Sequence, residues 1–427
     1  MRRGSRCPDS GDSFAPGTHG LPSRLAKLIP RSLQLMIRTA LALLLVLTTA
    51  SAQSQNAIPA PPELAASAYL LVDANSGEVL VEHNADEQLP PASLTKMMTA
   101  YVLAEEINAG RVKEEDMVRI SENAWSQNPI FNGSSLMWIE PGKDVSVADL
   151  QRGIIISSGN DATVAIAEHI AGSEAVFAEM MNTNAKRLGM TNTYYVNSHG
   201  LPDPAHLTTA RDLAILARAM INDHPEQYAI YKELEFTFNN IRQYNRNTLL
   251  LQDPTVDGLK TGHTKEAGYC LVASAERSGM RLISVVMGTK STKARKNDTA
   301  ALLNYGFRFY QTETAFEPMT ELAKPRVWKG VQDYVPVGLL DKVVLTLPRG
   351  KHDELQTDVA LDSEIEAPLA VGDAVGTVTV TLDGETQYQA PAVALQAVEE
   401  AGFFARLWDS ILMFIAELFG AGNTAAE

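Results

Sequence analysis

Three short strings in this chain carry residue types that together could perform acyl transfer at a serine. They are Ser93-Leu94-Thr95-Lys96, Ser158-Gly159-Asn160 and Lys260-Thr261-Gly262, and they follow one another in that order. Serine is a poor nucleophile at neutral pH and needs an adjacent base. A lone Ser-x-x-Lys is weak evidence because the spacing is common on helices, whereas the ordered trio strongly indicates a serine acyl-transfer enzyme.

The side chains of the strings suggest a division of labour. On a helix, residues three apart share a face, so Ser93 and Lys96 could come within hydrogen-bond reach. Lysine is a useful base only when partly neutral, and burial or a neighbouring cation, here Lys260, lowers its pKa in that direction. Asn160 could hold both the Lys96 amine and a substrate amide, and Ser158 could pass a proton to the departing amine.

Backbone features of the strings point the same way. Gly159 permits close approach of another part of the backbone. The run Lys260–Thr264 suits an edge strand along which a peptide adds as a further strand, and Gly262 would remove a side chain that blocks it. A catalytic metal has no support, because the chain contains neither His-Glu-x-x-His nor a cysteine cluster.

These strings resemble the signature of the low-molecular-mass penicillin-binding proteins, the serine D-alanyl-D-alanine carboxypeptidases. That set is S-x-x-K, S-D-N and K-T-G, shared with class A β-lactamases, and here the middle string is SGN instead. The similarity extends over 91–99, 157–161, 257–264 and 268–310, and more loosely over the later β segments and the amphipathic end. It therefore spans nearly the whole exported chain.

The resemblance implies a role for each matching position. Ser93 would form the acyl-enzyme with the penultimate D-alanine of a peptidoglycan pentapeptide, releasing the terminal D-alanine, and water would hydrolyse the ester. Lys96 would be the general base, Ser158 and Asn160 the second element, and Lys260 an electrostatic partner. β-Lactam antibiotics would acylate Ser93 as covalent inhibitors, and no cofactor is implied.

The resemblance also places the substrate. Thr261 and His263, on either side of Gly262, would line the site for the terminal carboxylate. The backbone N–H groups of Ser93 and His263 would form the oxyanion hole. Arg295 matches an arginine that helps to bind the carboxylate, although Lys290, Lys293 and Lys296 crowd the same segment.

Two other functions on the same fold stay open from the sequence. A β-lactamase of class A needs a deacylating glutamate between the second and third strings. No glutamate occurs from 180 to 225, where one would be expected, which argues against this function. A non-catalytic peptidoglycan-binding scaffold would keep the fold, but the three strings are intact. Release of D-alanine and labelling by a fluorescent penicillin would separate these alternatives.

Several other residues imitate catalytic motifs but have simpler structural interpretations, and we call them decoys. Tyr195-Val196-Asn197 imitates the Tyr-x-Asn string of class C β-lactamases, but Ser158-Gly159-Asn160 already supplies that element. His199 beside Ser198, with Asp212, could suggest a catalytic triad, yet no Gly-x-Ser-x-Gly elbow accompanies them. Cys270 lies in an apolar run and is interpreted as a core residue.

Composition and charge describe an ordinary globular protein. The chain has 427 residues, of which 45% are hydrophobic and 20% charged, enough for a sizeable core and two domains. A formal net charge of −15 is unsuited to binding nucleic acid, since that requires neutralising phosphates. The only cysteines are Cys7 and Cys270, so a mature chain lacking Cys7 has no internal disulfide.

The first 52 residues predict export. From Met36, a basic Arg38, an apolar run over 40–47 and the small residues Ala50-Ser51-Ala52 form the layout of a cleavable secretory signal. Residues 1–35 show no periodicity, so we expect translation to start at Met36. We expect the mature chain at the periplasmic face of the inner membrane as a peripheral protein.

The spacing of apolar residues along the chain predicts the helices and strands that position the three strings. Strands are expected at 68–73, 78–82, 258–264, 269–275 and 281–287, and helices at 93–105, 162–171, 210–221 and 292–310. Two β segments, a helical insertion and three more β segments predict an α+β fold of the β-lactamase/transpeptidase type, with an antiparallel sheet flanked by helices and a helical subdomain. The catalytic domain is assigned to 53–315.

Beyond it the pattern changes twice. Residues 316–395 predict a small all-β domain, with strands at 343–347 and 376–382 and a hairpin turn at Asp383-Gly384. Residues 396–427 contain an amphipathic helix over 403–419, whose narrow polar stripe carries internal charges. We expect this helix to lie in a membrane interface rather than span the bilayer, with docking on its own protein or a partner as the alternative.

Overall fold

The computed structural model describes the backbone of residues 58–418 and side chains as far as residue 415. The expected export signal and the segment before it therefore lie outside the described residues. Every helix and strand described below belongs to the unit Ala60–Glu427.

A five-stranded sheet forms the centre of the catalytic domain. Its order across the sheet is β2 (Val79–His83), β1 (Ala68–Asp73), β9 (Met280–Thr289), β8 (Gly268–Arg277) and β7 (Val256–Thr264). Every neighbouring pair is antiparallel, as the sequence predicted. Strand β7, which carries the third string, is an edge strand, and this also confirms the prediction.

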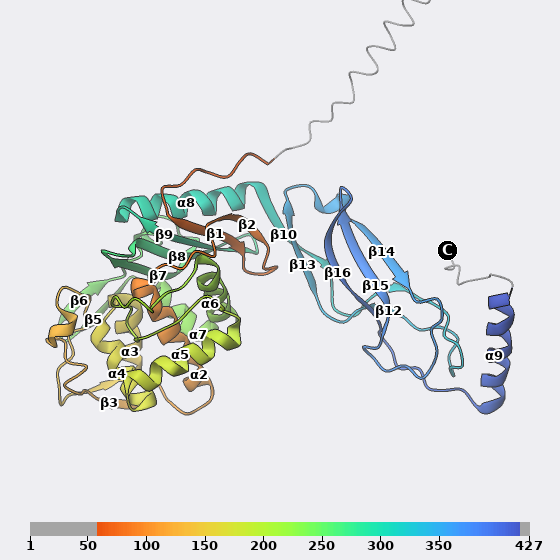
Figure 1. Ribbon diagram of the computed structural model, residues 1–427, viewed down its shortest axis with the longest axis horizontal. Coiled ribbons are helices and arrows are strands. Elements are labelled where there is room, and N and C mark those ends of the chain that lie inside the picture. The colour runs from red at the N-terminus through yellow and green to blue at the C-terminus, as the bar shows by residue number, and fades with distance from the viewer. Residues whose placement is uncertain (1–57, 419–427) are drawn as a thin grey trace, which may run out of the picture. The chain divides into compact units, whose positions relative to one another are not determined.

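Helices cover both faces of this sheet (Figure 1). α8 (Thr292–Phe309) packs against β8 and β9 on one face, and α6 (Ala210–Asp223) packs against β1 and β9 on the other. The long apolar runs of β8 and β9 follow from this arrangement, since strands covered on both faces cannot alternate with polar residues. The predicted ranges agree with the observed elements to within about three residues, which is ordinary at element ends.

The helical subdomain gathers the remaining elements of the catalytic domain. Its helices are α2 (Lys96–Asn108), α3 (Val147–Arg152), α4 (Asn160–Ala171), α5 (Glu174–Leu188) and α7 (Pro225–Tyr228), with short helical turns at η1 (Ala92–Thr95), η2 (Pro129–Phe131), η3 (Gly153–Ser157), η4 (Ala229–Lys232) and η5 (Thr248–Leu251). Two small ribbons accompany them, β3 (Met117–Arg119) with β4 (Asp144–Ser146) and β5 (Glu235–Phe238) with β6 (Ile241–Tyr244).

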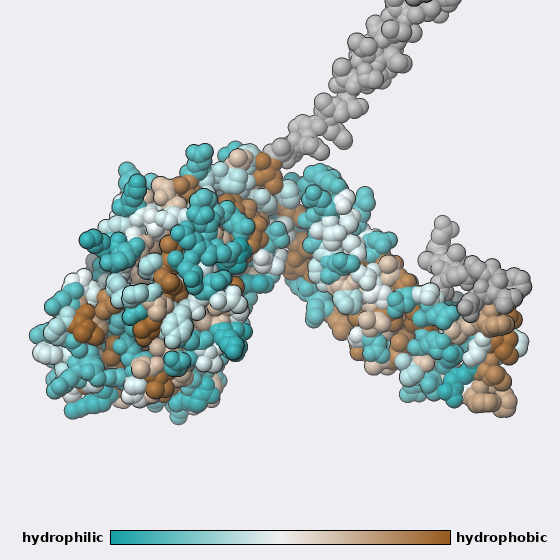
Figure 2. Space-filling view, in the orientation of Figure 1, coloured by the Kyte–Doolittle hydropathy of each residue, from teal (hydrophilic) through white to brown (hydrophobic). Residues whose placement is uncertain are grey.

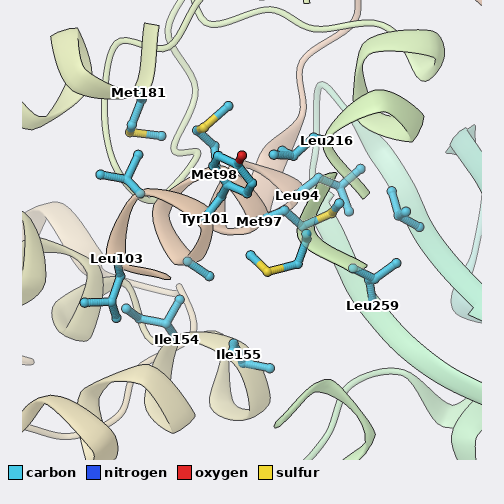
Figure 3. Packing of buried hydrophobic residues seen from close by; sticks show 14 of the residues in the cluster. Leu94, Met97, Met98, Tyr101, Leu103, Ile154, Ile155, Met181, Leu216 and Leu259 are labelled. Carbon is cyan, nitrogen blue, oxygen red and sulfur yellow. The ribbon is translucent and has the colours of Figure 1, made fainter. Parts of the chain in front are cut away.

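Helix α2 passes through the core of this subdomain. Its own Met97 and Tyr101 belong to one buried apolar cluster with Leu94, Ile154 and Leu216 from neighbouring elements (Figure 3). Nearly every α2 position from Lys96 to Ala104 is buried. A helix that is apolar almost all round must be buried on every side, and this fixes the N-terminal end of α2, where the first string lies.

A separate all-β domain follows, as predicted. It contains β10 (Tyr310–Phe316) paired with β13 (Val343–Pro348), and a five-stranded sheet in the order β11 (Thr320–Ala323), β12 (Val337–Leu339), β16 (Glu385–Ala394), β15 (Ala374–Leu382) and β14 (Gln356–Leu361), with one turn at η6 (His352–Glu354). Asp383 and Gly384, both at positive φ, join β15 to β16 as the expected hairpin. Strand β10 begins six residues before the expected boundary at 316, because it continues directly from α8.

The last described element is α9 (Phe403–Leu418). Together these elements confirm the α+β fold with an all-β domain and a terminal helix. Within residues 58–418, no helix combines the length and the apolar character needed to cross a membrane.

Candidate active site

The first string lies at the junction of η1 and α2 rather than inside one helix. We expected a helix from Ser93, but Ser93 lies in the 3-10 turn Ala92–Thr95, α2 begins at Lys96, and no side chain caps either start. Thr95 stabilises the turn, since its hydroxyl donates to the Ala92 carbonyl at 2.8 Å and lies 2.8 Å from His206 Nε2. The tight turn still places Ser93 and Lys96 on one side.

The Lys96 ammonium is completely buried and donates three hydrogen bonds. Its Nζ lies 3.1 Å from Ser93 Oγ, 2.6 Å from Asn160 Oδ1 and 2.8 Å from the carbonyl oxygen of His199. These three acceptors use all the donors that an ammonium group offers. When Lys96 is neutral, its lone pair can instead accept the proton of the serine hydroxyl.

Burial lowers the pKa of Lys96 to about 7, while Asp161 and Glu174 act in the opposite direction through their charge. The sequence offered two causes for a low pKa of Lys96, burial and the neighbouring cation of Lys260, and desolvation by burial is the dominant one. The Lys260 side chain is equally buried, and its pKa is well below the usual value because of desolvation first and the Lys96 charge second. The site thus holds two lysines, each easily deprotonated.

The second string forms a sharp corner between two helices. The π-helical turn η3 ends at Ser158, whose φ of 60° is left-handed, and α4 begins at Asn160. The Ser158 hydroxyl accepts a 2.9 Å hydrogen bond from Lys260 Nζ, so Ser158 joins the second string to the third. A Cβ on Gly159 would lie 2.9 Å from the backbone nitrogen of Met137, which explains the close approach that the glycine permits.

Asp161, which we did not predict as a site residue, fixes this corner. It is fully buried, and its carboxylate accepts hydrogen bonds from the backbone N–H groups of Met137 (2.8 Å), Trp138 (2.8 Å), Ile139 (3.2 Å) and Ala162 (3.0 Å). The same loop supplies the Ser135 carbonyl, which accepts from Asn160 N at 2.9 Å. The sequence feature that could have identified Asp161 is its position directly after the second string.

The third string lies on edge strand β7 against η1. Lys260 and Thr261 are buried, and His263 is exposed, with its ring stacked on Tyr269 at 3.9 Å between centroids. A Cβ on Gly262 would lie 2.9 Å from the Pro91 carbonyl oxygen. The glycine is therefore required by the packing of β7 on η1. That it also clears the path of a bound peptide stays a prediction.

Arg295, from α8, reaches the same strand. Its Nη1 donates to the carbonyl oxygens of Gly262 at 3.2 Å and Cys270 at 3.4 Å, and its guanidinium lies 5.7 Å from the centre of the Tyr269 ring. Burial lowers its pKa, although an arginine stays charged in the physiological range. Arg295 thus presents a fixed cation next to Thr261 and His263.

These side chains line one pocket of about 240 Å³, called here the catalytic pocket. Seven of the predicted residues line it: Ser93, Ser158, Asn160, Thr261, Gly262, His263 and Arg295. Lys96 and Lys260 are not part of the lining, but they form hydrogen bonds with the lining residues Ser93 and Ser158. It also contains residues that we did not predict, including Ser134, Ser135, His199, Leu201 and Arg246. Arg246 comes from the segment between β6 and η5, which carries no recognisable string.

The decoys have structural roles. Asp212 accepts from Asn192 N and the Thr193 hydroxyl, away from His199. Burial lowers the pKa of His199 to about 3, and its ring Nδ1 accepts from Leu201 N, so His199 is neutral and contributes its carbonyl to Lys96. Burial raises the pKa of Cys270 to about 11, as befits a core thiol.

Sequence patterns of two known families match this chain. The D-alanyl-D-alanine carboxypeptidase family, peptidase S11, matches residues 54–291, and the C-terminal domain of penicillin-binding protein 5 matches residues 310–400. D-alanyl-D-alanine carboxypeptidase DacC from Escherichia coli strain K12 is 47% identical over 84% of this chain and 91% of its own length. DacA from Haemophilus influenzae is 45% identical over 84% of this chain and 92% of its own.

Solved structures agree with the sequence matches. Penicillin-binding protein 5 from Haemophilus influenzae superimposes with a TM-score of 0.77 at 44% identity, covering 80% of this chain and all of the other. Penicillin-binding protein 6B from Escherichia coli gives a TM-score of 0.67 at 38% identity over 79% of this chain and 98% of its own. The family match over residues 54–291 and the relatives at 45–47% identity show that the chain belongs to the peptidase S11 family, the serine-type D-alanyl-D-alanine carboxypeptidases.

Proposed function

We propose that this chain removes the terminal D-alanine from peptidoglycan pentapeptides through an ester on Ser93. The observation that carries the proposal is the buried Lys96 amine, 3.1 Å from Ser93 Oγ and with its pKa lowered to about 7. A general base works best when its pKa lies near the operating pH. The names of the relatives identify the class of substrate.

Acylation begins when neutral Lys96 takes the Ser93 proton and Oγ attacks the carbonyl carbon of the penultimate D-alanine. The oxyanion accepts hydrogen bonds from the backbone N–H groups of Ser93 and His263. Ser158, bonded to Lys260 at 2.9 Å, donates a proton to the departing amine as the peptide C–N bond breaks. The proton that Lys96 took from Ser93 then replaces the one that Ser158 gave up, so Lys96 is neutral again. Asn160 orients both Lys96 and the substrate amide, since its Oδ1 already accepts from Lys96 and its amide faces the pocket.

The terminal carboxylate binds at the end of the pocket formed by Thr261, His263 and Arg295. A carboxylate there gains from the fixed guanidinium, which the Gly262 and Cys270 carbonyls hold in place. After D-alanine leaves, a water molecule gives its proton to Lys96 and attacks the ester, which returns Ser93 to its hydroxyl form. Hydrolysis of the amide thus consumes one water and forms one new carboxylic acid, on the shortened peptide, and one new amine, on the released D-alanine.

β-Lactams are proposed as covalent inhibitors of the same serine. Structures of penicillin-binding protein D2 from Listeria monocytogenes in ampicillin-bound and cefotaxime-bound forms are 32% identical to this chain, with TM-scores of 0.52 and 0.53. We expect a fluorescent penicillin to label Ser93 and the adduct to hydrolyse slowly. Rapid turnover of the β-lactam would instead favour a β-lactamase.

One preparation can test these points together. Purified protein is incubated with a pentapeptide ending in D-Ala-D-Ala, and released D-alanine is measured beside β-lactam hydrolysis. Ser93→Ala should lose both peptide turnover and penicillin labelling, with its melting temperature as a control for folding. Full D-alanine release by Ser93→Ala would refute the mechanism, and labelling without any peptide turnover would favour a penicillin-binding scaffold.

We further propose that α9 holds the exported protein on the periplasmic face of the inner membrane. Large apolar side chains on α9 are exposed and gather on it in Figure 2, among them Phe403, Phe404, Leu407, Trp408, Ile411, Phe414 and Ile415. Burying each is worth about 1.5 to 3 kcal/mol. Asp409 on the opposite side accepts from Lys329 N at 2.7 Å, which turns the apolar side outward.

Fractionation of cells tests the anchor. Deleting residues 400–427 should release the protein from membranes, and Phe404→Ser with Trp408→Ser should do so partly while leaving D-alanine release in detergent unchanged. Unchanged membrane association after the deletion would refute the proposal. The secretory signal from Met36, cleaved after Ala52, is proposed from the sequence, and N-terminal sequencing of the precursor and the mature protein tests both positions.

A further inference from the structure

The loop that follows η2 contains a dipeptide that the proposed mechanism does not use. It is Asn132-Gly133, and no other asparagine of the 427 residues precedes a glycine. Gly133, Ser134 and Ser135 line the catalytic pocket, and Asn132 lies directly before them. A chemical change at Asn132 would therefore act on the wall of the catalytic pocket.

Asn132 and Gly133 are both exposed. The φ of Gly133 is +75°, and a Cβ built on it would have no atom within 4 Å apart from its chain neighbours. Within residues 58–415, neither the Gly133 N–H nor the Asn132 side chain forms a hydrogen bond. Because glycine carries no side chain to shield its backbone nitrogen, this nitrogen is free to approach the Asn132 amide.

Two other asparagines of the same segment lack one of these features. Asn128 precedes Pro129, which has no N–H, and its Nδ2 donates to the Asn123 carbonyl at 3.1 Å. Asn123 is exposed but precedes an alanine, and its Nδ2 donates to Glu168 Oε1 at 2.9 Å. Of the three, Asn132 combines an unbonded amide with a following glycine.

We propose that Asn132 is a site of spontaneous deamidation, through which the protein slowly modifies the wall of its own catalytic pocket. Asparagine is a thermolabile residue. The Gly133 nitrogen gives up its proton and attacks Asn132 Cγ, the new C–N bond closes a five-membered imide, and the side-chain nitrogen leaves as ammonia. Water then opens the imide at either carbonyl, which gives aspartate or isoaspartate. The sum is one water consumed and one ammonia released, without oxidant, reductant or cofactor.

The two products have different effects on the loop. Aspartate at position 132 adds an exposed charge, whereas isoaspartate routes the backbone through the side chain and lengthens it by one atom. A residue with three backbone atoms spans at most about 3.6 Å, so one extra atom adds about 1 Å. Isoaspartate is therefore the product that distorts the loop.

Fixed contacts on both sides of the dipeptide prevent the loop from absorbing this length. Phe131 is buried with its ring edge-on to His199, and its carbonyl oxygen accepts from Ser134 N at 2.9 Å and Ser134 Oγ at 2.7 Å. The Ser135 carbonyl oxygen accepts from Asn160 N at 2.9 Å. The extra atom lies between these anchors and must displace Ser134 and the glycine before it. A misplacement of about 1 Å can cost about a hundredfold in rate.

Mass spectrometry of aged protein tests the site. The purified protein is incubated in mildly alkaline buffer, which deprotonates more of the backbone amide, and is then digested with trypsin. Cleavage after Arg119 and Lys143 gives one peptide that contains Asn123, Asn128 and Asn132. We expect the mass increase of NH₂ replaced by OH at Asn132 before any change at the other two. Methylation by an isoaspartyl methyltransferase should detect the isoaspartate.

Ageing should also slow acylation of Ser93, measured as labelling by a fluorescent penicillin. We expect biphasic labelling, with a second phase at least about tenfold slower whose amplitude equals the isoaspartate fraction. Asn132→Gln is the matched control, because its longer side chain closes a six-membered ring far more slowly, and it should label normally before and after ageing. Freshly prepared Asn132→Asp carries the charge without the extra backbone atom and should label within about threefold of the unmodified protein. The melting temperature shows whether each sample stays folded.

Each outcome addresses a different step. No deamidation at Asn132, or equal deamidation at Asn123, would overturn the modification site. Isoaspartate at position 132 with unchanged labelling, or the same loss of labelling in aged Asn132→Gln, would overturn its effect on the pocket, and slow labelling of Asn132→Asp would assign that effect to charge instead of backbone length. The site does not depend on the proposed function. If fresh protein failed to label, that function would fail, while the mass measurement would still decide the fate of Asn132.

Discussion

The pKa of Lys96 predicts a specific pH dependence for acylation of Ser93. With a pKa of about 7, about half of Lys96 is neutral at pH 7, about a tenth at pH 6 and about a hundredth at pH 5. An unperturbed lysine would be neutral in roughly one molecule in three thousand at pH 7, so burial increases the active form on the order of a thousandfold.

The assay is the second-order rate constant for labelling by a fluorescent penicillin across this range. Because the base acts when neutral, the rate constant should rise about tenfold per pH unit up to pH 6 and level off above pH 8. Lys96→Arg should not label at any pH, since arginine stays protonated. Circular dichroism and the melting temperature show whether this variant folds.

A second perturbation tests the cause of the shift. Glu174 raises the pKa of Lys96 through its charge, so Glu174→Gln should move the midpoint of the profile to lower pH. The amide can still accept the hydrogen bond that Glu174 Oε1 receives from the Ser198 hydroxyl. A midpoint near pH 10, a flat profile from pH 5 to 9, or an upward shift in Glu174→Gln would refute the reasoning.

The same pKa has a consequence for stability. The folded pKa of Lys96 lies below its value in the unfolded chain, so the unfolded state binds more protons between about pH 7 and pH 10.5. The cost of burying the charged amine is fully present below pH 7 and disappears as the pH rises toward 10.5. Lys96 therefore contributes a term to the free energy of unfolding that increases over this window.

Three further predictions concern single residues. Asp161→Asn replaces one carboxylate oxygen by an NH2 group that cannot accept, so two backbone hydrogen bonds are lost. Chemical denaturation should show that the free energy of unfolding falls by about 3 kcal/mol, and penicillin labelling should slow. An unchanged labelling rate would contradict the role of Asp161 in fixing the corner. Gly262→Ala places a Cβ 2.9 Å from the Pro91 carbonyl and should cost about 1 to 3 kcal/mol and at least tenfold in labelling rate; normal labelling would show that η1 can yield. Cys270, buried with its pKa raised to about 11, should react with iodoacetamide only after unfolding, and alkylation of the native protein seen by mass spectrometry would contradict the packed core.

Much of the fold could be predicted because hydrophobic periodicity encodes which face of an element is buried. The strand expected at 68–73 coincides with β1, and the position of β7 at the sheet edge followed from the polar and glycine residues of the third string. The start of α2 was wrong by three residues. The local sequence is compatible with a helix from Ser93, but the segment Ala92–Thr95 packs against β7, and Thr95 contacts His206, so these residues form a 3-10 turn.

The sequence by itself determined the chemistry of this protein, since a serine, two lysines and an asparagine in the correct order identify an acyl-transfer site without any coordinates. The tertiary structure decided how those groups are tuned. The His199 carbonyl that holds Lys96 and the side chain of Arg246 come from outside the three strings. Asp161 directly follows the second string, but the backbone that it anchors lies 22 to 24 residues earlier. Local patterns record which face of an element is buried but not which distant partner lies against it, and the burial of Lys96 arises from that packing.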